Sequence, residues 1–250
     1  MSLRPDLAVI AARVQPATRA LDIGCGDGAL MAALAEKGCD ARGMEIDPEL
    51  VQRCVSRGLS VVQGDADRDL ADYPDKAFDY AILSQTLQTA ARPDRMLDEL
   101  LRVGRQAFVS FPNFAHWRMR SALALGGRMP VTRHLPVSWY ETQNIHHVTV
   151  SDFRDLIAAM GVKCERAWFF AGDREIGAGL ARDDHAGDFP EAAADPVAGD
   201  RIADLAADGK ADPNRREGQL CRRRGNLQDK SGHGTTAAGL DAQKVTTVRQ

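Results

Sequence analysis

The sequence predicts an α/β fold in which a Rossmann-like, mainly parallel sheet carries helices on both faces. Up to about residue 170, short apolar runs alternate with longer segments whose apolar residues recur at helical spacing, the pattern of repeated β–α–β units. A cluster of glycines at 24–28 follows the first apolar run, as in α/β folds that bind a ligand at the ends of their strands. No internal repeat is visible, so we expect a single domain built from such units.

Glycine and proline mark the first elements. The apolar run that ends at Ile23 leads into the glycine cluster and then into a helix that stops at Gly38, a common residue type at helix C-termini. A second strand at 41–46 is followed by Pro48 at a helix-start position, and that helix ends near Gly58. We therefore expect a strand, a helix, a second strand and a second helix in succession.

The remaining elements continue this alternation. A third strand covers 59–62, and the run at 78–83 is almost wholly apolar, as expected of a central strand buried on both faces. Pro93 opens a further helix. Beyond it we expect a strand at 107–111, helices at 116–125 and 152–160, and a sixth strand at 162–170.

The composition gives the chain no general affinity for polyanions or membranes. The formal net charge is −3, and no run of 18 apolar residues occurs. The mildly apolar N-terminal stretch is interrupted by Arg4, Asp6 and Arg13, unlike a signal peptide. The five cysteines are odd in number and contain no C-x-x-C pair. We expect a cytoplasmic protein without a nucleic-acid or membrane partner, without a disulfide framework and without a metal site.

The chain changes character after about residue 171. All aromatic residues except Phe189 precede that point, and the segment beyond Gly172 is rich in Ala, Asp and Gly. Such a segment buries too little apolar area to offset the cost of ordering its backbone, about 1 to 2 kcal/mol per residue. We therefore expect a folded domain at 1–172 and a low-complexity tail at 173–250. The tail is expected to be either disordered or the product of a reading-frame shift in GC-rich coding sequence.

The strongest local signal is the segment Leu21-Asp-Ile-Gly-Cys-Gly-Asp-Gly28, a strand that runs into glycines and then into a helix. Glycines there permit a tight turn and let a ligand approach the backbone. Gly24, Gly26 and Ala29 also satisfy a dinucleotide fingerprint, and Glu45 at the end of the second strand is available for a ribose hydroxyl. A cofactor with an adenosine ribose follows, but the glycines alone do not choose which one.

Acidic residues favour a cofactor without phosphate at this place. Asp22 and Asp27 flank the position of a pyrophosphate, and like charges at about 4 Å repel by roughly 1 to 4 kcal/mol. S-adenosyl-L-methionine (SAM) instead offers an ammonium and a sulfonium. Asp65 follows the third strand, where its carboxylate can accept the adenine amino group or can cap a helix or turn. A nicotinamide-dependent oxidoreductase remains an alternative through the glycine fingerprint and is disfavoured by Asp22.

Longer motifs resemble a known family. LDIGCGDG, GMEID, QGDAD and FDYAILSQTLQ look like successive motifs of class I SAM-dependent methyltransferases, and SFPNF, HWR, GRMPVT and WYETQNIH resemble the methionine biosynthesis protein MetW over about residues 15–170. By that resemblance, Glu45 would bind the ribose hydroxyls and Asp65 the adenine, while Ser84 and Gln85 would line the pocket. The methionine moiety would be framed by Asp22, Gly24, Gly26 and Gly28.

The resemblance leaves two hypotheses about function. MetW proteins act beside homoserine O-acyltransferase (MetX), which implies a SAM-binding, methyltransferase-like accessory factor of methionine biosynthesis. The alternative is an active methyltransferase on an unidentified small-molecule or protein acceptor. Methyl transfer from a sulfonium needs mainly alignment of the reacting groups, so few catalytic residues need be visible. Polar candidates near the acceptor side are Gln85, Gln88, Asn113, His116, Tyr140, His146 and His147, with His146, His147 and Tyr140 as catalytic candidates; loop packing is the competing interpretation of the histidines.

The resemblance also exposes a mismatch at the C-terminal side. In the methyltransferase fold a seventh, antiparallel strand follows the sixth, and after Ile176 this sequence offers no credible strand. We therefore expect the sheet to lack a proper last strand and to leave the edge at 162–170 open.

Overall fold

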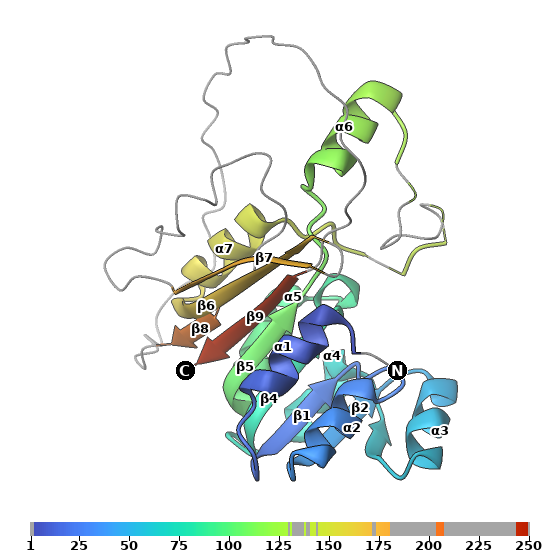
Figure 1. Ribbon diagram of the computed structural model, residues 1–250, viewed down its shortest axis with the longest axis vertical. Coiled ribbons are helices and arrows are strands. Elements are labelled where there is room, and N and C mark those ends of the chain that lie inside the picture. Colours follow the sequence, from blue (N-terminus) through green and yellow to red (C-terminus); the bar gives the residue numbers. More distant parts are fainter. Residues whose placement is uncertain are drawn as a thin grey trace.

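The computed structural model describes residues 3–129, 131, 138, 141–143, 145–171, 174–180, 204–207 and 244–249. Within these residues a nine-stranded sheet carries helices on both faces (Figure 1). The strands are β1 Arg19–Ile23, β2 Asp40–Glu45, β3 Ser60–Gln63, β4 Phe78–Ser84, β5 Gly104–Ser110, β6 Val162–Ala171, β7 Arg174–Leu180, β8 Asp204–Ala207 and β9 Lys244–Arg249. The helices are α1 Pro5–Arg13, α2 Ala29–Glu36, α3 Pro48–Ser56, α4 Ala66–Asp69, α5 Pro93–Val103, α6 Trp117–Gly126 and α7 Val150–Ala159, with 3₁₀ turns η1 Leu70–Asp72 and η2 Leu87–Thr89.

The sheet has the doubly wound order β3-β2-β1-β4-β5-β9-β8-β6-β7. Strands β3, β2, β1, β4 and β5 are parallel, and the chain moves outward from β1 to β3 before it returns to the other side of β1 as β4. The order therefore reverses between β1 and β4. In open α/β sheets ligands bind outside the carboxyl ends of the strands at such a reversal, which here is the position of the glycine loop.

The core lies on both faces of the central strands. Leu21, Ile23, Ile82 and Leu83 are fully buried in β1 and β4, which confirms the central strand predicted from its apolar run. Helix α5 covers one face with Met96, Leu97, Leu100 and Leu101, while α1 and α2 lie together on the other (Figure 1). This packing fixes the carboxyl ends of β1 and β4 relative to each other.

Two features differ from the sequence prediction. Helix α1 was not predicted, although Pro5 at its start, Asp6 in its first turn and Leu7, Ile10 and Ala11 on its buried side form a helix signal. The expectation that the sheet lacks its last strand is wrong, because β9 lies antiparallel between β5 and β6. Residues 244–249 read Lys-Val-Thr-Thr-Val-Arg, a β-branched run that suits a strand but stands far from β6 in the chain.

The region beyond β6 contains two more strands in its described part. β7 pairs antiparallel with β6 on its outer edge, so the expectation of no strand after Ile176 is also wrong, and β8 pairs with both β6 and β9. Most of the predicted tail at 173–250 lies outside the described residues, and its separation from the domain at 1–172 stays a prediction. In the part of the chain that the structure covers, no helix is long and apolar enough to cross a membrane.

Candidate functional site

The glycine loop is shaped by three residues in the left-handed region. Gly24, Gly26 and Gly28 have φ angles of 69°, 58° and 76°. A Cβ atom on Gly24 would collide with the Thr86 hydroxyl, and one on Gly28 would collide with Leu59, whereas a Cβ on Gly26 would meet no atom of the described residues within 4 Å. Gly24 and Gly28 thus serve tight packing, and Gly26 is the position at which the backbone is open to a ligand.

Asp22 is a buried carboxyl group directly before this loop. The residue is 3% exposed, and among the described residues no hydrogen-bond donor reaches its buried Oδ1 atom. Burial raises the pKa of Asp22 to about 7, with Arg4 acting in the opposite direction and Glu45 and Asp6 adding to the rise. A buried carboxyl oxygen without a partner is costly inside a protein, and a cationic group of a ligand would satisfy Oδ1 of Asp22.

Glu45 connects the end of β2 to the glycine loop. Its Oε2 accepts a hydrogen bond from the Gly26 amide at 2.8 Å, and its Oε1 accepts from the amides of Ile46 and Asp47 at 2.9 and 3.1 Å. The carboxylate therefore holds the loop in position, and Oε2, which accepts one hydrogen bond, retains a second lone pair for a hydroxyl donor. The sequence interpretation of Glu45 included only the ribose contact.

Asp65 lies at the start of α4 and caps it. Its Oδ1 accepts from the Asp67 amide at 3.1 Å, and its Oδ2 pairs with Nε of Arg68 at 3.1 Å. The capping interpretation that the sequence left open therefore describes Asp65 in this structure. The residue still follows β3 at the carboxyl end of the sheet, where the adenine contact was expected.

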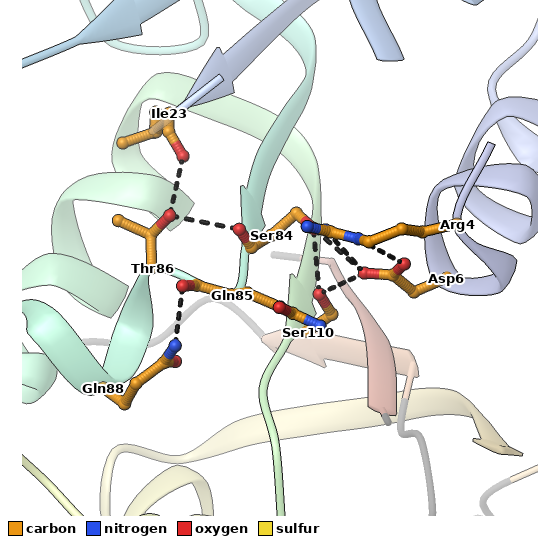
Figure 2. A network of polar contacts seen from close by, with 8 residues as sticks. All are labelled: Arg4, Asp6, Ile23, Ser84, Gln85, Thr86, Gln88 and Ser110. Carbon is orange, nitrogen blue, oxygen red and sulfur yellow. Dashed lines mark hydrogen bonds and ion pairs between the residues drawn. The ribbon is translucent and has the colours of Figure 1, made fainter. Parts of the chain in front are cut away.

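Ser84 belongs to a buried network that ties α1 to the sheet (Figure 2). Its hydroxyl lies 3.1 Å from Oδ2 of Asp6 and 3.1 Å from Oγ of Ser110, and it accepts from Nη2 of Arg4 at 2.7 Å. Ser110 also donates to Asp6 at 3.0 Å. The hydroxyl of Ser84 thus faces the first residues of α1, which the pocket-lining interpretation did not anticipate.

Gln85, the residue after β4, adopts the left-handed conformation with φ of 54°. Its amide donates to the Ser110 carbonyl at 2.8 Å, and its own carbonyl accepts from Nε2 of Gln88 at 2.7 Å (Figure 2). Strained backbone of this kind at the end of a strand often accompanies a functional site. Here it holds Gln85 and Gln88 together beside the reversal in strand order.

His146 is brought to the same place as Gln85 and Gln88, whereas His147 is not. The amide of His146 donates to the Gln88 carbonyl at 3.0 Å. Within the described part of the chain, Nε2 of Gln85, Oε1 of Gln88 and Nε2 of His146 are buried without a hydrogen-bond partner. His147 is exposed, and its ring lies edge-on to Phe114 at 4.8 Å. Tyr140 lies outside the described residues.

Asn113 and His116 are used locally. Oδ1 of Asn113 accepts from the Ala115 amide, and the side chain of His116 caps α6. No group of three or more His, Cys, Asp or Glu side chains in the described ranges is arranged to hold a metal ion.

Sequence reasoning missed Arg4 and Asp6. Asp6 is fully buried, and Arg4 contacts both Asp6 and Ser84 although the three residues come from segments almost 80 positions apart. The Arg-Pro-Asp start of α1 was a usable helix signal, but no local pattern pairs it with the end of β4.

Comparison with known proteins decides the family. A family model described as "Methionine biosynthesis protein MetW" matches residues 4–182. The chain belongs to the MetW family. A MetW relative from Rhodopirellula baltica, the "Bifunctional methionine biosynthesis protein MetXA/MetW", is 32% identical over 184 residues, which is 70% of this chain and 30% of that protein. The "Ubiquinone biosynthesis O-methyltransferase" of Xanthomonas axonopodis pv. citri is 32% identical over 139 residues, 52% of this chain and 57% of its own length. The match thus spans about a third to just over half of these two relatives.

Solved structures confirm the fold class. A SAM-dependent methyltransferase from Methanosarcina mazei superimposes with a TM-score of 0.54 at 19% identity, covering 71% of this chain and 95% of that one. One from Archaeoglobus fulgidus gives a TM-score of 0.52 at 16% identity, covering 96% and 94%. This MetW protein therefore has the α/β fold of class I SAM-dependent methyltransferases.

Proposed function

We propose that this MetW protein binds SAM and acts as an accessory factor of homoserine O-acyltransferase in methionine biosynthesis. The observation that carries the proposal is that, among the described residues, Oδ1 of Asp22 has no hydrogen-bond partner and no atom crowds the adjacent glycine loop at Gly26. A cytoplasmic location, as expected from the sequence, agrees with this role.

The residues present fit SAM better than a pyrophosphate cofactor. Asp22 and Glu45 place two buried carboxyl groups around the loop, where they favour cations and repel phosphate. Asp22, Gly24, Gly26 and Gly28 would hold the methionine moiety, Glu45 the ribose hydroxyls and Asp65 the adenine, with Gln85 at the edge of the pocket. When bound, SAM supplies an electrophilic methyl group or simply a metabolic signal, depending on whether an acceptor exists.

The partner is inferred from a relative. The Rhodopirellula baltica protein combines MetXA and MetW in its printed name, and this chain matches less than a third of its length. Two functions carried in one chain commonly also operate together when they are encoded separately. This supports an association with homoserine O-acyltransferase (MetX).

Two experiments test the proposal. Calorimetric titration should show SAM binding, with binding weakened at least about tenfold in Asp22→Ala; binding of NADH in place of SAM would contradict it. For the partner, the full chain is mixed with homoserine O-acyltransferase, and we expect co-elution on size exclusion and a changed rate of acetyl transfer. Separate elution together with an unchanged rate would exclude the accessory role.

A second candidate function is methyl transfer to an acceptor. It is favoured by Gln85, Gln88 and His146, which meet after the end of β4 and each carry a buried polar atom without a hydrogen-bond partner among the described residues. Gln85 and Gln88 would orient an acceptor hydroxyl or amine, and Nε2 of His146 would take its proton. Release of S-adenosylhomocysteine from SAM in the presence of fractionated cell extract, abolished by His146→Gln, would support this function. Absence of product from every fraction would leave the accessory role as the function.

A further inference from the structure

We propose that Arg4, at the start of α1, binds the carboxylate of the amino-acid end of SAM, so that Arg4 and Asp22 together recognise its zwitterionic group. The inference rests on the proposed binding of SAM and adds a residue that lies outside every motif of the sequence analysis. It also gives α1 a part in the site.

The sheet register places Arg4 and Asp22 over the same face. Asp22 pairs with Ile82 in β4, and Ser84 pairs with Ser110 in β5. Because side chains two residues apart on a strand share a face, Asp22, Ser84 and Ser110 all point to the side on which α1 begins. Both serines there contact Asp6, and Ser84 receives a hydrogen bond from Arg4 at 2.7 Å (Figure 2).

The guanidinium group of Arg4 is held in a fixed orientation and still has hydrogen-bond donors available for a ligand. Its Nε and Nη2 donate to the two oxygens of Asp6 at 3.1 and 3.0 Å, which orients the planar group. Within the described residues Nη1 donates no hydrogen bond, and 42% of the side chain is exposed. A fixed guanidinium with free donors suits a carboxylate ligand.

Charge requires a cation at this place. A SAM carboxylate that entered beside Asp22 and Glu45 would be repelled by both. Three charged groups influence the pKa of Asp22: Arg4, Glu45 and Asp6. Of these three, Arg4 alone is positively charged and can pair with the SAM carboxylate. The charge of Asp6 is compensated by its own hydrogen bonds to Arg4 and the two serines.

The test compares SAM with decarboxylated SAM, which keeps the ammonium and the sulfonium but lacks the carboxylate. For the wild-type chain we expect SAM to bind about 10- to 100-fold more tightly than the decarboxylated compound, the value of a charge-assisted, partly desolvated hydrogen-bond pair. In Arg4→Gln the affinity for SAM should fall by that factor, and the affinity for decarboxylated SAM should stay within about twofold. Arg4→Lys, which keeps the charge but loses the fork, should fall between the two.

Arg13→Gln is the matched control, because Arg13 lies at the opposite end of α1, with its guanidinium 5.1 Å from the ring centre of Trp168. It should leave both affinities unchanged. If Arg4→Gln weakens both ligands equally, Arg4 acts only by anchoring α1 and the inference is wrong; unchanged affinities for both would also overturn it. If wild-type protein binds neither compound, the proposed function itself fails and the inference falls with it.

Discussion

Asp22 illustrates how a single buried residue can make ligand binding depend on pH. Its pKa of about 7 means that the carboxyl is mostly neutral at pH 6 and mostly ionised at pH 8 in the free protein. The α-ammonium group of SAM, with an ordinary pKa of about 7.7 to 8, stays mostly protonated up to about pH 7.5, so affinity should rise by up to about tenfold between pH 5.5 and 7.5. Calorimetric titration across this range measures the slope, and Asp22→Asn should bind weakly with a flat profile. Equal slopes in both proteins would mean that Asp22 does not contact the ligand.

Ionised Asp22 should lower the stability of the ligand-free protein while it favours ligand binding. Because burial raises the pKa of Asp22 above its unfolded value of 3.8, the folded state is favoured while the group is protonated, and this stability is lost as the pH rises toward about 7. Asp22→Asn should therefore unfold at a higher temperature than the ligand-free wild type, with a gain that grows from pH 5 to pH 8 and reaches at most about 4 kcal/mol. Thermal unfolding at several pH values tests the sign. A gain that is independent of pH would point to a cause other than ionisation.

Two glycines of the loop should respond differently to alanine. Gly28→Ala places a Cβ against Leu59 and Cys54 in a left-handed conformation, so it should destabilise the fold by about 2 to 4 kcal/mol. Gly26→Ala meets no atom of the described residues within 4 Å and carries only the conformational cost, about 1 kcal/mol, but its methyl group would stand where we propose that SAM approaches. We expect urea unfolding to show a loss of stability mainly in Gly28→Ala, and SAM titration to show a loss of affinity mainly in Gly26→Ala. The reverse pattern would move the ligand away from Gly26.

At the scale of elements, the attachment of α1 depends on one carboxylate. Asp6 is fully buried and accepts hydrogen bonds from Arg4, Ser84 and Ser110, so Asp6→Ala should lower the free energy of unfolding by about 2 to 4 kcal/mol. Asp40→Ala removes an exposed partner of Arg42 and should cost no more than about 0.5 kcal/mol. Urea denaturation of both variants makes the comparison. Similar losses would show that the network contributes little to stability.

The sequence was informative wherever a local pattern decides the structure. The apolar run of β4, the proline that opens α5 and the glycines after β1 each act within a few residues, and the structure confirms the elements they predict. Positions that depend on distant partners were not predictable in this way. The hydroxyl of Ser84 turns toward Asp6 because α1 returns to the end of β4, and Glu45 holds the Gly26 amide because β2 ends beside the loop.

For the whole molecule, the open question is where the domain ends. The family match stops at residue 182, whereas β8 and β9 come from beyond it. The boundary predicted at residue 172 thus falls inside the family match, and the separation of 173–250 from the domain at 1–172 stays a prediction. Inspection of the other reading frames of the gene tests the origin of this segment: an apolar strand in another frame supports a frame shift, and its absence rejects one.

Whether the residues beyond 172 belong to the folded domain can be tested through strand β9. It pairs with β5 along 106–110 and with β6 between Cys164 and Phe169, so its removal leaves two facing strand edges without partners. If β9 is part of the folded sheet, a chain that ends at residue 243 should lose at least about 10 °C in Tm and self-associate on size exclusion, because open edges pair with other chains.

Two substitutions within β9 separate pairing from chain length. Thr246→Pro removes a backbone N–H from the ladder between Val109 and Ala167 and should reproduce the effect of the truncation, whereas Thr246→Val keeps the N–H and the β-branched shape and should be neutral. Because β9 pairs with both β5 and β6, we expect the truncated chain and Thr246→Pro each to have a lower Tm than the full chain. If both remain as stable as the full chain, β9 does not hold the sheet together, and the boundary near residue 172 defines the functional unit.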